Sequence, residues 1–317
     1  GVMPDRFIDY KKQRFRWGSL VAVLLVAVAG IGAFAYYQRQ ESEKQKALAQ
    51  DIFYTMKGLD VDIANVQKMV IESNNERGAE QVNRYRARRE EMKKNYDRYL
   101  NSLHVYNKKM TEQERLILRV ARIYGECELT IPEGFNEEVL NYIKKWQGSP
   151  RYAAAIRRAQ ENGYTKRIAD EMITQGLPPQ FYYLALQESN FEPLISGPET
   201  YMGFAKGMWQ FIPQTGLKYG LTIGPLADRP RPDPADERHQ WEKATNAAAR
   251  YLSDLYTKEA LGSGLLVMAS YNWGEHKVKK LIASLPANTR ERNFWVLLEK
   301  YKDDIPKETY DYVFYIF

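Results

Sequence analysis

A single glutamate, Glu188, has a sequence environment suited to acid–base chemistry. It closes a run of apolar and aromatic residues, 181–186, that follows Pro178 and Pro179. Prolines suit the first turn of a helix, and a run that is apolar on every face predicts a buried helix. A carboxyl group desolvated at the end of such a helix has a raised pKa and can donate a proton near neutral pH. A glutamate at a helix end is by itself more often a solvated or capping residue, so the segments that follow decide its role.

Four sequence elements begin at Glu188 and follow one another in a fixed order. They are E-S-N-F-E-P at 188–193, A-K-G-M-W-Q-F-I-P-Q-T-G at 205–216, D-E-R at 236–238 and A-S-Y-N-W-G-E at 269–275. This set resembles the catalytic domain of lytic transglycosylases, the lysozyme-like enzymes that cut the glycan strands of peptidoglycan, and it is most similar to the membrane-bound D type. The family's closing element is matched by N-F-W at 293–295 and P-K-E-T at 306–309. No single element is specific, whereas the ordered set is.

The resemblance implies a mainly α, lysozyme-like domain over residues 177–317 in which one carboxylate performs both proton transfers. Ordinary glycosidases use two carboxylates. By resemblance, Glu188 first protonates the β-1,4 bond between N-acetylmuramic acid and N-acetylglucosamine. It then removes the proton of the muramic 6-hydroxyl, which closes on C1 to give a 1,6-anhydro sugar without consuming water. The substrate's N-acetyl group replaces the second carboxylate. Acid and base work by one residue needs a pKa near working pH.

The resemblance also assigns supporting roles to five other residues. The hydroxyl of Tyr271 is expected to orient the catalytic carboxylate, and the amide of Gln210 is expected to hydrogen-bond the sugar near the cleavage point. Ser196 corresponds to a serine that contacts the N-acetyl group. Ser189 and Asn272 are expected to be polar groups around the catalytic glutamate.

The chain departs from the family pattern between its first two elements. Ser196 lies eight residues past Glu188, and Gly207 comes eleven residues after Ser196, so about five residues are inserted within 197–204. The insertion leaves the role of Ser196 open. By resemblance, the inserted loop lies beside the cleft and influences substrate choice.

Metal and disulfide chemistry have no support in the sequence. Cys127 is the only cysteine, which excludes a disulfide within the chain and a cysteine-ligated metal cluster. His104, His239 and His276 lie far apart with no ligand spacing between them. We therefore expect neither a metal nor a cofactor.

An apolar segment near the amino terminus predicts a single transmembrane helix over residues 18–38. The segment carries no charge and is long enough to span a bilayer. Trp17 at one end and Tyr36 and Tyr37 at the other are typical of membrane interfaces. Residues 1–17 would then form a cytoplasmic tail.

A cleaved signal peptide is the alternative, because residues 33–35, A-F-A, resemble a small-x-small cleavage site. The apolar region is longer than the usual 7–15 residues of a signal peptide, and no lipobox cysteine is present. Five lysines and arginines precede the span, and three occur in the fifteen residues after it. This bias predicts a single-pass inner-membrane protein with its catalytic domain in the periplasm.

Residues 39–130 predict a helical stalk. Apolar residues recur at steps of three and four from Ile52 to Val70, and Asn74-Asn75 marks a turn into a second helix. The arginines and lysines of that helix alternate with acidic residues, which indicates a solvated face rather than nucleic-acid binding. Residues 131–176 predict short helices that lead into the catalytic domain.

The sequence thus predicts a membrane-anchored lytic transglycosylase acting on peptidoglycan glycan strands, with the stalk as a candidate surface for cell-envelope protein partners. The net charge of +6 suits anionic partners without selecting among them. One alternative is a hydrolytic muramidase of the goose type, which would gain support if Glu192 or Glu199 faced Glu188 across the sugar. The other is a non-catalytic scaffold that binds the wall.

Overall fold

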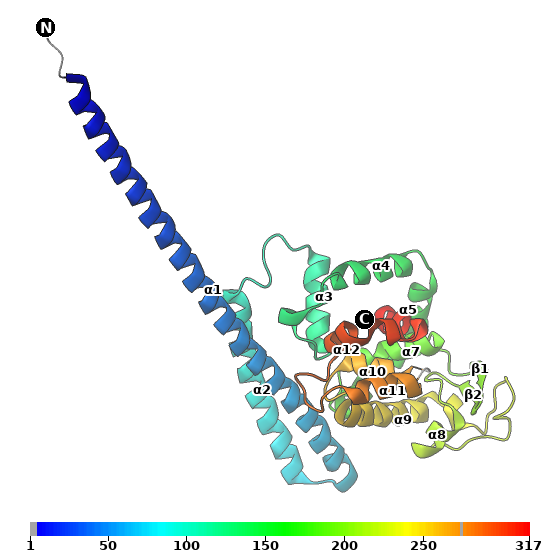
Figure 1. Cartoon of the computed structure of the whole chain (residues 1–317). Coiled ribbons are helices and arrows are strands. Elements are labelled where there is room, and N and C mark those ends of the chain that lie inside the picture. The colour runs from blue at the N-terminus through cyan, green and yellow to red at the C-terminus, as the bar shows by residue number, and fades with distance from the viewer. Residues whose placement is uncertain (1–4, 273–274) are drawn as a thin grey trace. The chain divides into compact units, whose positions relative to one another are not determined.

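The computed structural model describes residues 5–272 and 275–317, and the chain is mainly α-helical (Figure 1). It divides into two compact units, one that ends at Ala49 and one that runs from Gln50 to Phe317. Residues 1–4 of the predicted tail and residues 273–274 of the fourth sequence element lie outside the described residues.

The first unit belongs to helix α1 (Asp5–Ser73). Within the described residues, α1 is the one helix long and apolar enough to cross a membrane, from Trp17 onward. Its apolar side chains between Trp17 and Tyr37 are exposed. The apolar helix that the sequence predicts over 18–38 is therefore present as part of α1.

The second unit begins with a helical hairpin formed by the rest of α1 and by α2 (Glu76–Ser102). Asn75 caps α2, and its side chain accepts a hydrogen bond from the Arg77 amide. Phe53 of α1 packs against Tyr96 of α2, with ring centroids 5.4 Å apart. The turn predicted at Asn74-Asn75 is confirmed, and the two helices lie side by side (Figure 1).

Four helices, together with a short 3₁₀ turn, connect the hairpin to the region of the candidate site. They are α3 (Glu112–Ile123), η1 (Glu128–Thr130), α4 (Phe135–Gln147), α5 (Arg151–Glu161) and α6 (Tyr164–Thr174). Thr111 and Glu114 form a capping box at the start of α3, which satisfies two backbone amides that a helix start otherwise leaves unpaired.

The remaining elements surround the residues predicted to act in catalysis. They are η2 (Pro179–Phe181), α7 (Tyr182–Ser189), β1 (Ser196–Thr200), β2 (Gly203–Lys206), α8 (Pro213–Lys218), η3 (Glu237–His239), α9 (Trp241–Asp254), η4 (Leu255–Glu259), α10 (Gly264–Tyr271), α11 (Glu275–Ser284), α12 (Phe294–Tyr301), η5 (Lys302–Asp304) and α13 (Lys307–Ile316). Helix α9 ends in the π-helical turn η4.

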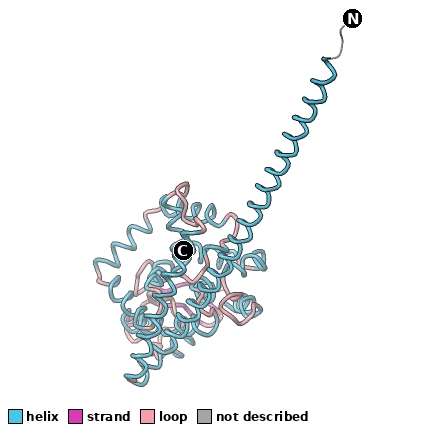
Figure 2. Tube along the Cα trace, turned by 90° about the vertical axis from the view of Figure 1, so that its left-hand side faces the viewer, coloured by secondary structure: helices cyan, strands magenta, loops and turns pink. Residues whose placement is uncertain are grey.

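The inserted segment forms an antiparallel β-hairpin, which the sequence analysis did not predict. Ser196 of β1 pairs with Lys206 of β2, and Thr200 pairs with Gly203. The register is irregular between Ser196 and Glu199, the stretch that contains Pro198. Proline cannot donate a ladder hydrogen bond and is confined to edge strands or bulges. Because Pro198 lies within β1, the residue pattern does not predict this strand. Among the described residues, strands are confined to this hairpin (Figure 2).

The core of the second unit is built around α10, whose residues 264–270 are buried on every side. The helix packs against η4, α11 and α13. The same cluster of buried residues includes Ala64 of α1 and Ile117 of α3. Helix α1 of the hairpin and helix α3 therefore contribute to the core that holds the candidate site.

Candidate active site

Glu188 lies in the last turn of α7, half-buried, and its carboxylate meets α13. The hydroxyl of Tyr312 donates a hydrogen bond to its Oε1 at 2.6 Å. Burial raises the pKa of Glu188 to about 7, the Tyr312 hydrogen bond opposes that rise, and the negative charge of Glu308 adds to it. A carboxyl group with this pKa can both donate and accept a proton near neutral pH. The raised pKa expected from the apolar helix before Glu188 is therefore found.

Tyr271 ends α10 and lies close enough to Glu188 for the two to interact electrostatically. Its hydroxyl, however, donates to the backbone carbonyl of Trp209 at 2.7 Å. The expectation that the Tyr271 hydroxyl orients Glu188 is therefore corrected, because the hydroxyl that contacts the carboxylate belongs to Tyr312. The P-K-E-T element marks the start of α13, but no feature of the sequence indicates that Tyr312 reaches Glu188 from 124 positions away.

Gln210 lies at the end of a tight turn that starts at Gly207. Both residues have positive φ angles, +85° at Gly207 and +52° at Gln210. A Cβ atom at Gly207 would lie 1.8 Å from the Arg238 carbonyl oxygen, so only glycine fits there. The Gln210 side-chain amide donates to the Gly207 carbonyl at 2.8 Å. Its other amide atom, Oε1, faces Gly197 of β1, where an added Cβ would lie 2.2 Å away.

Ser189 and Asn272 connect the segments that carry the site. The Ser189 hydroxyl lies within hydrogen-bond distance of the Ala185 carbonyl (3.1 Å) and the Met208 carbonyl (2.8 Å). The Asn272 side-chain oxygen accepts from the Thr309 hydroxyl at 2.9 Å, which connects the end of α10 to α13. Both residues are buried. These hydrogen bonds go to the segments around the site rather than to the Glu188 carboxylate.

Ser196 starts β1, and its hydroxyl oxygen is buried without a hydrogen-bond partner among the described residues. The two extra carboxylates considered in the sequence have other surroundings. Glu192 forms an ion pair with Arg158 at 3.2 Å, and Glu199 is exposed on β1. The second carboxylate that influences Glu188 is instead Glu308, in the first turn of α13.

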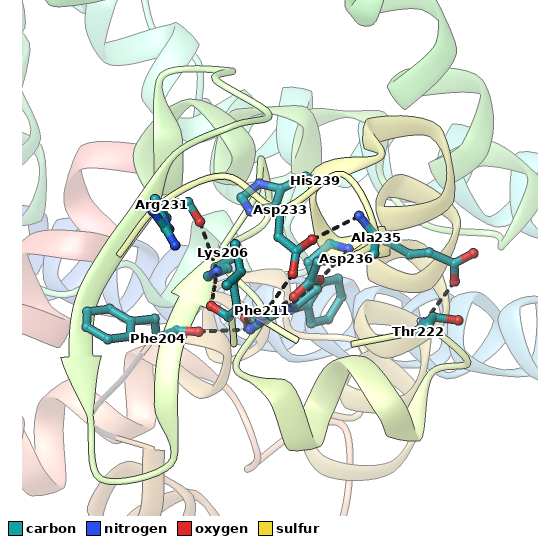
Figure 3. A network of polar contacts seen from close by, with 12 residues as sticks. Phe204, Lys206, Phe211, Thr222, Arg231, Asp233, Ala235, Asp236 and His239 are labelled. Atoms are coloured by element: carbon teal, nitrogen blue, oxygen red, sulfur yellow. Dashed lines mark hydrogen bonds and ion pairs between the residues drawn. The ribbon is translucent and has the colours of Figure 1, made fainter. Parts of the chain in front are cut away.

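A buried network holds the turn that carries Gln210 (Figure 3). Arg238 has no exposed side-chain surface and donates two hydrogen bonds, at 2.9 and 2.7 Å, to the Asp236 carboxylate. Its remaining donors reach the carbonyls of Phe204 (2.8 Å) and Phe211 (2.9 Å), on either side of the turn. A guanidinium presents several donors in a rigid fork, which suits this bracing role.

Lys206 extends the same network into the loop before η3 (Figure 3). Its side chain is fully buried, and its ammonium donates to the carbonyls of Leu226 (2.7 Å) and Arg231 (3.0 Å). The Asp233 carboxylate accepts from the Leu226 amide at 2.9 Å. The D-E-R element thus braces the β-hairpin and the Gln210 turn together.

Among the described residues, no group of three histidine, cysteine, aspartate or glutamate side chains is arranged to hold a metal ion.

Glu188 thus lies half-buried at the end of α7, in a mainly helical domain built around the buried helix α10. Residues 167–294 match the family model of the transglycosylase SLT domain, a lysozyme-like domain. The resemblance that the four sequence elements indicated is thereby confirmed.

Two curated relatives carry the same description, membrane-bound lytic murein transglycosylase D, one from Escherichia coli strain K12 and one from Escherichia coli O6:H1. Each is 30% identical to this protein over 193 residues, which is 61% of this chain and 38% of the relative. The chain thus spans well under half the length of these relatives.

Proposed function

We propose that the protein is a lytic transglycosylase that cleaves the β-1,4 bond between N-acetylmuramic acid and N-acetylglucosamine in peptidoglycan. The observation that carries the proposal is Glu188, a single half-buried carboxyl group with a pKa raised to about 7, within an SLT domain. The names of the two relatives support the substrate class.

In the proposed reaction, the protonated Glu188 carboxyl donates its proton to the glycosidic oxygen as the bond to C1 breaks. The leaving sugar keeps that oxygen as its 4-hydroxyl. The substrate's N-acetyl group stabilises the positive charge that develops at C1. The Glu188 carboxylate then removes the proton of the muramic 6-hydroxyl, and the bond from O6 to C1 closes. The enzyme regains its starting protonation state, and no water is consumed.

The other residues of the site have supporting roles in this proposal. Tyr312 holds the Glu188 carboxylate through its 2.6 Å hydrogen bond. Gln210 is positioned by the turn at Gly207 to present its amide to the sugar, and Gly197 of β1, the residue after Ser196, faces that amide. Tyr271 positions the Trp209 carbonyl rather than the carboxylate.

We further propose that residues 18–38 anchor the protein in the inner membrane and that the second unit faces the periplasm. The apolar helix, the charge bias around it and the membrane-bound relatives support this arrangement. The substrate lies on the same side of that membrane. Protein partners of the α1–α2 hairpin remain a prediction from the sequence.

The test is digestion of purified peptidoglycan by the full chain in detergent, beside Glu188→Gln, with mass spectrometry of the released muropeptides. Glutamine keeps the shape of the side chain but cannot transfer the proton. Products one water lighter than hydrolytic fragments, with 1,6-anhydro ends and absent from the mutant, are expected. Reducing ends would indicate a muramidase in which Glu308 serves as the second carboxylate. Glycan binding without release by the wild-type protein would indicate a scaffold.

A further inference from the structure

The chain leaves α7, directly after the catalytic glutamate, through an unusual backbone conformation. Asn190 and Phe191 both have left-handed φ angles, +53° and +61°. Asparagine adopts this conformation at helix ends, whereas an aromatic residue rarely does and needs its surroundings to hold it there. The last carbonyls of a helix also lack partners within it. The end of α7 therefore depends on groups outside the helix.

Arg151, the first residue of α5, supplies several of these groups. Its Nε donates to the Asn190 side-chain oxygen at 2.5 Å. One of its terminal nitrogens lies 3.1 Å from the Gln187 carbonyl and 3.3 Å from the Leu186 carbonyl. The guanidinium lies over the ring of Trp146, 5.1 Å from its centroid. Arg151 thus contacts the chain on both sides of the catalytic glutamate.

Arg158 lies two helical turns further along the same face of α5. One of its terminal nitrogens donates to the Asn190 backbone carbonyl at 2.6 Å. The other forms the 3.2 Å ion pair with Glu192. Arg158 therefore holds the segment just after α7, where the backbone is left-handed. By contrast, Arg157 on the neighbouring face of α5 is exposed.

We propose that Arg151 and Arg158 are positioning residues for Glu188: they fix the end of α7 so that the carboxylate stays where Tyr312 and the sugar meet it. Neither arginine touches the carboxylate in the contacts described above, so both act through the backbone. The effect on catalysis rests on the proposed function, whereas the contacts by which the two arginines hold the backbone do not. Helix α5 lies outside residues 167–294, so this contribution comes from the segment that precedes the matched domain.

The test compares Arg151→Met and Arg151→Lys with Arg157→Met as the matched control on the same helix. Steady-state rates are measured on a soluble peptidoglycan fragment, and hydrogen–deuterium exchange is followed in the peptide 185–192. Small displacements of a catalytic group can cost up to about 100-fold in rate. We expect kcat to fall about 10-fold or more in Arg151→Met, with KM nearly unchanged and faster exchange in this peptide. Arg151→Lys should lose less than Arg151→Met, because its ammonium can still donate to one of the oxygens at the end of α7, but it should not keep the full rate, because one ammonium cannot reproduce the guanidinium fork.

Three results would overturn the proposal. The first is a folded Arg151→Met protein with wild-type kcat and wild-type exchange. The second is a raised KM at unchanged kcat, which would make Arg151 a substrate-binding residue. The third is an equal loss in Arg157→Met, which would indicate that any change on α5 has the same effect. If Arg151→Met does not fold, Arg151→Lys and Arg158→Met provide the same comparison. A wild-type protein that releases no anhydro product would refute the proposed function. The exchange measurement would still show whether Arg151 holds the end of α7 in place.

Discussion

At the scale of single residues, the hydroxyl of Tyr312 influences both the position and the proton affinity of Glu188. A hydroxyl that donates to a carboxylate stabilises the charged form, so it holds the pKa of Glu188 below the value that burial alone would produce. Proton donation requires the neutral form. The rate should therefore fall as the pH rises through the pKa of Glu188, about 7.

Replacing Tyr312 by phenylalanine should move this alkaline limb upward. Loss of the hydrogen bond removes a group that lowers the pKa of Glu188, and a hydrogen bond to a charged group is worth enough to shift a pKa by about one unit. The maximal rate should fall as well, because the carboxylate loses its contact with α13. The measurement is the pH dependence of kcat/KM. Tyr310→Phe on the same helix is the control, and an unshifted limb in Tyr312→Phe would contradict the assignment.

The sequence predicted the burial of Glu188 better than it predicted the partner of its carboxylate. Glu188 stands at the end of an apolar run, and its burial follows from that local pattern. The partner of its carboxylate depends on how α13 packs against α7, which is a tertiary contact between residues far apart in the chain. The hydroxyl of Tyr271 was assigned to that place by resemblance, and in the structure it contacts the Trp209 carbonyl instead. The contacts between Arg151 and the end of α7 were not predicted for the same reason, because they too join residues far apart in the chain.

At the scale of elements, the β-hairpin and the loop after α8 depend on a buried lysine. Lys206 is fully buried, and its ammonium pairs with two carbonyls of that loop. Burial and the neighbouring Arg238 cation lower the pKa of Lys206. The helices of this region were predictable from apolar spacing and capping residues. The hairpin and the loop were not, because backbone carbonyls and one buried cation determine their conformation.

Replacing Lys206 by methionine should loosen the loop over residues 222–235. The substitution keeps the length of the side chain but leaves the Leu226 and Arg231 carbonyls without their donor, at a cost of about 1–3 kcal/mol in the free energy of unfolding. Limited proteolysis should then cut this loop faster than in the wild type. Lys218→Met, at an exposed lysine nearby, is the control. Equal cleavage rates in Lys206→Met and the wild type would show that the ammonium does not hold the loop.

At the scale of the whole molecule, the α1–α2 hairpin packs against the other helices of the second unit. Lys57 of α1 is almost fully buried and donates to the carbonyls of Thr289 (2.9 Å) and Arg292 (3.2 Å). Burial lowers its pKa to about 8, and the nearby buried Glu126 opposes that change. The sequence predicted the hairpin from its periodicity. It gave no sign that the inner face packs on the segment before α12, because periodicity reveals a buried face but not its partner.

The placement of α1 in this core predicts which fragments can fold. Residues 50–317 should melt in a single cooperative transition, because Ala64 belongs to the same buried cluster as the α10 side chains. Residues 131–317, the predicted lead-in and catalytic segments alone, lack Lys57 and Glu126 and expose the surface that Ala64 covers beside Gly176. The fragment also lacks Ile117 and Tyr124 of the same buried cluster, and loss of a large buried side chain costs about 2–5 kcal/mol, a large share of the stability of an ordinary domain. Thermal unfolding followed by circular dichroism should therefore show no cooperative transition for 131–317 at neutral pH. A sharp transition near that of 50–317 would instead mean that the helical hairpin is an independent stalk.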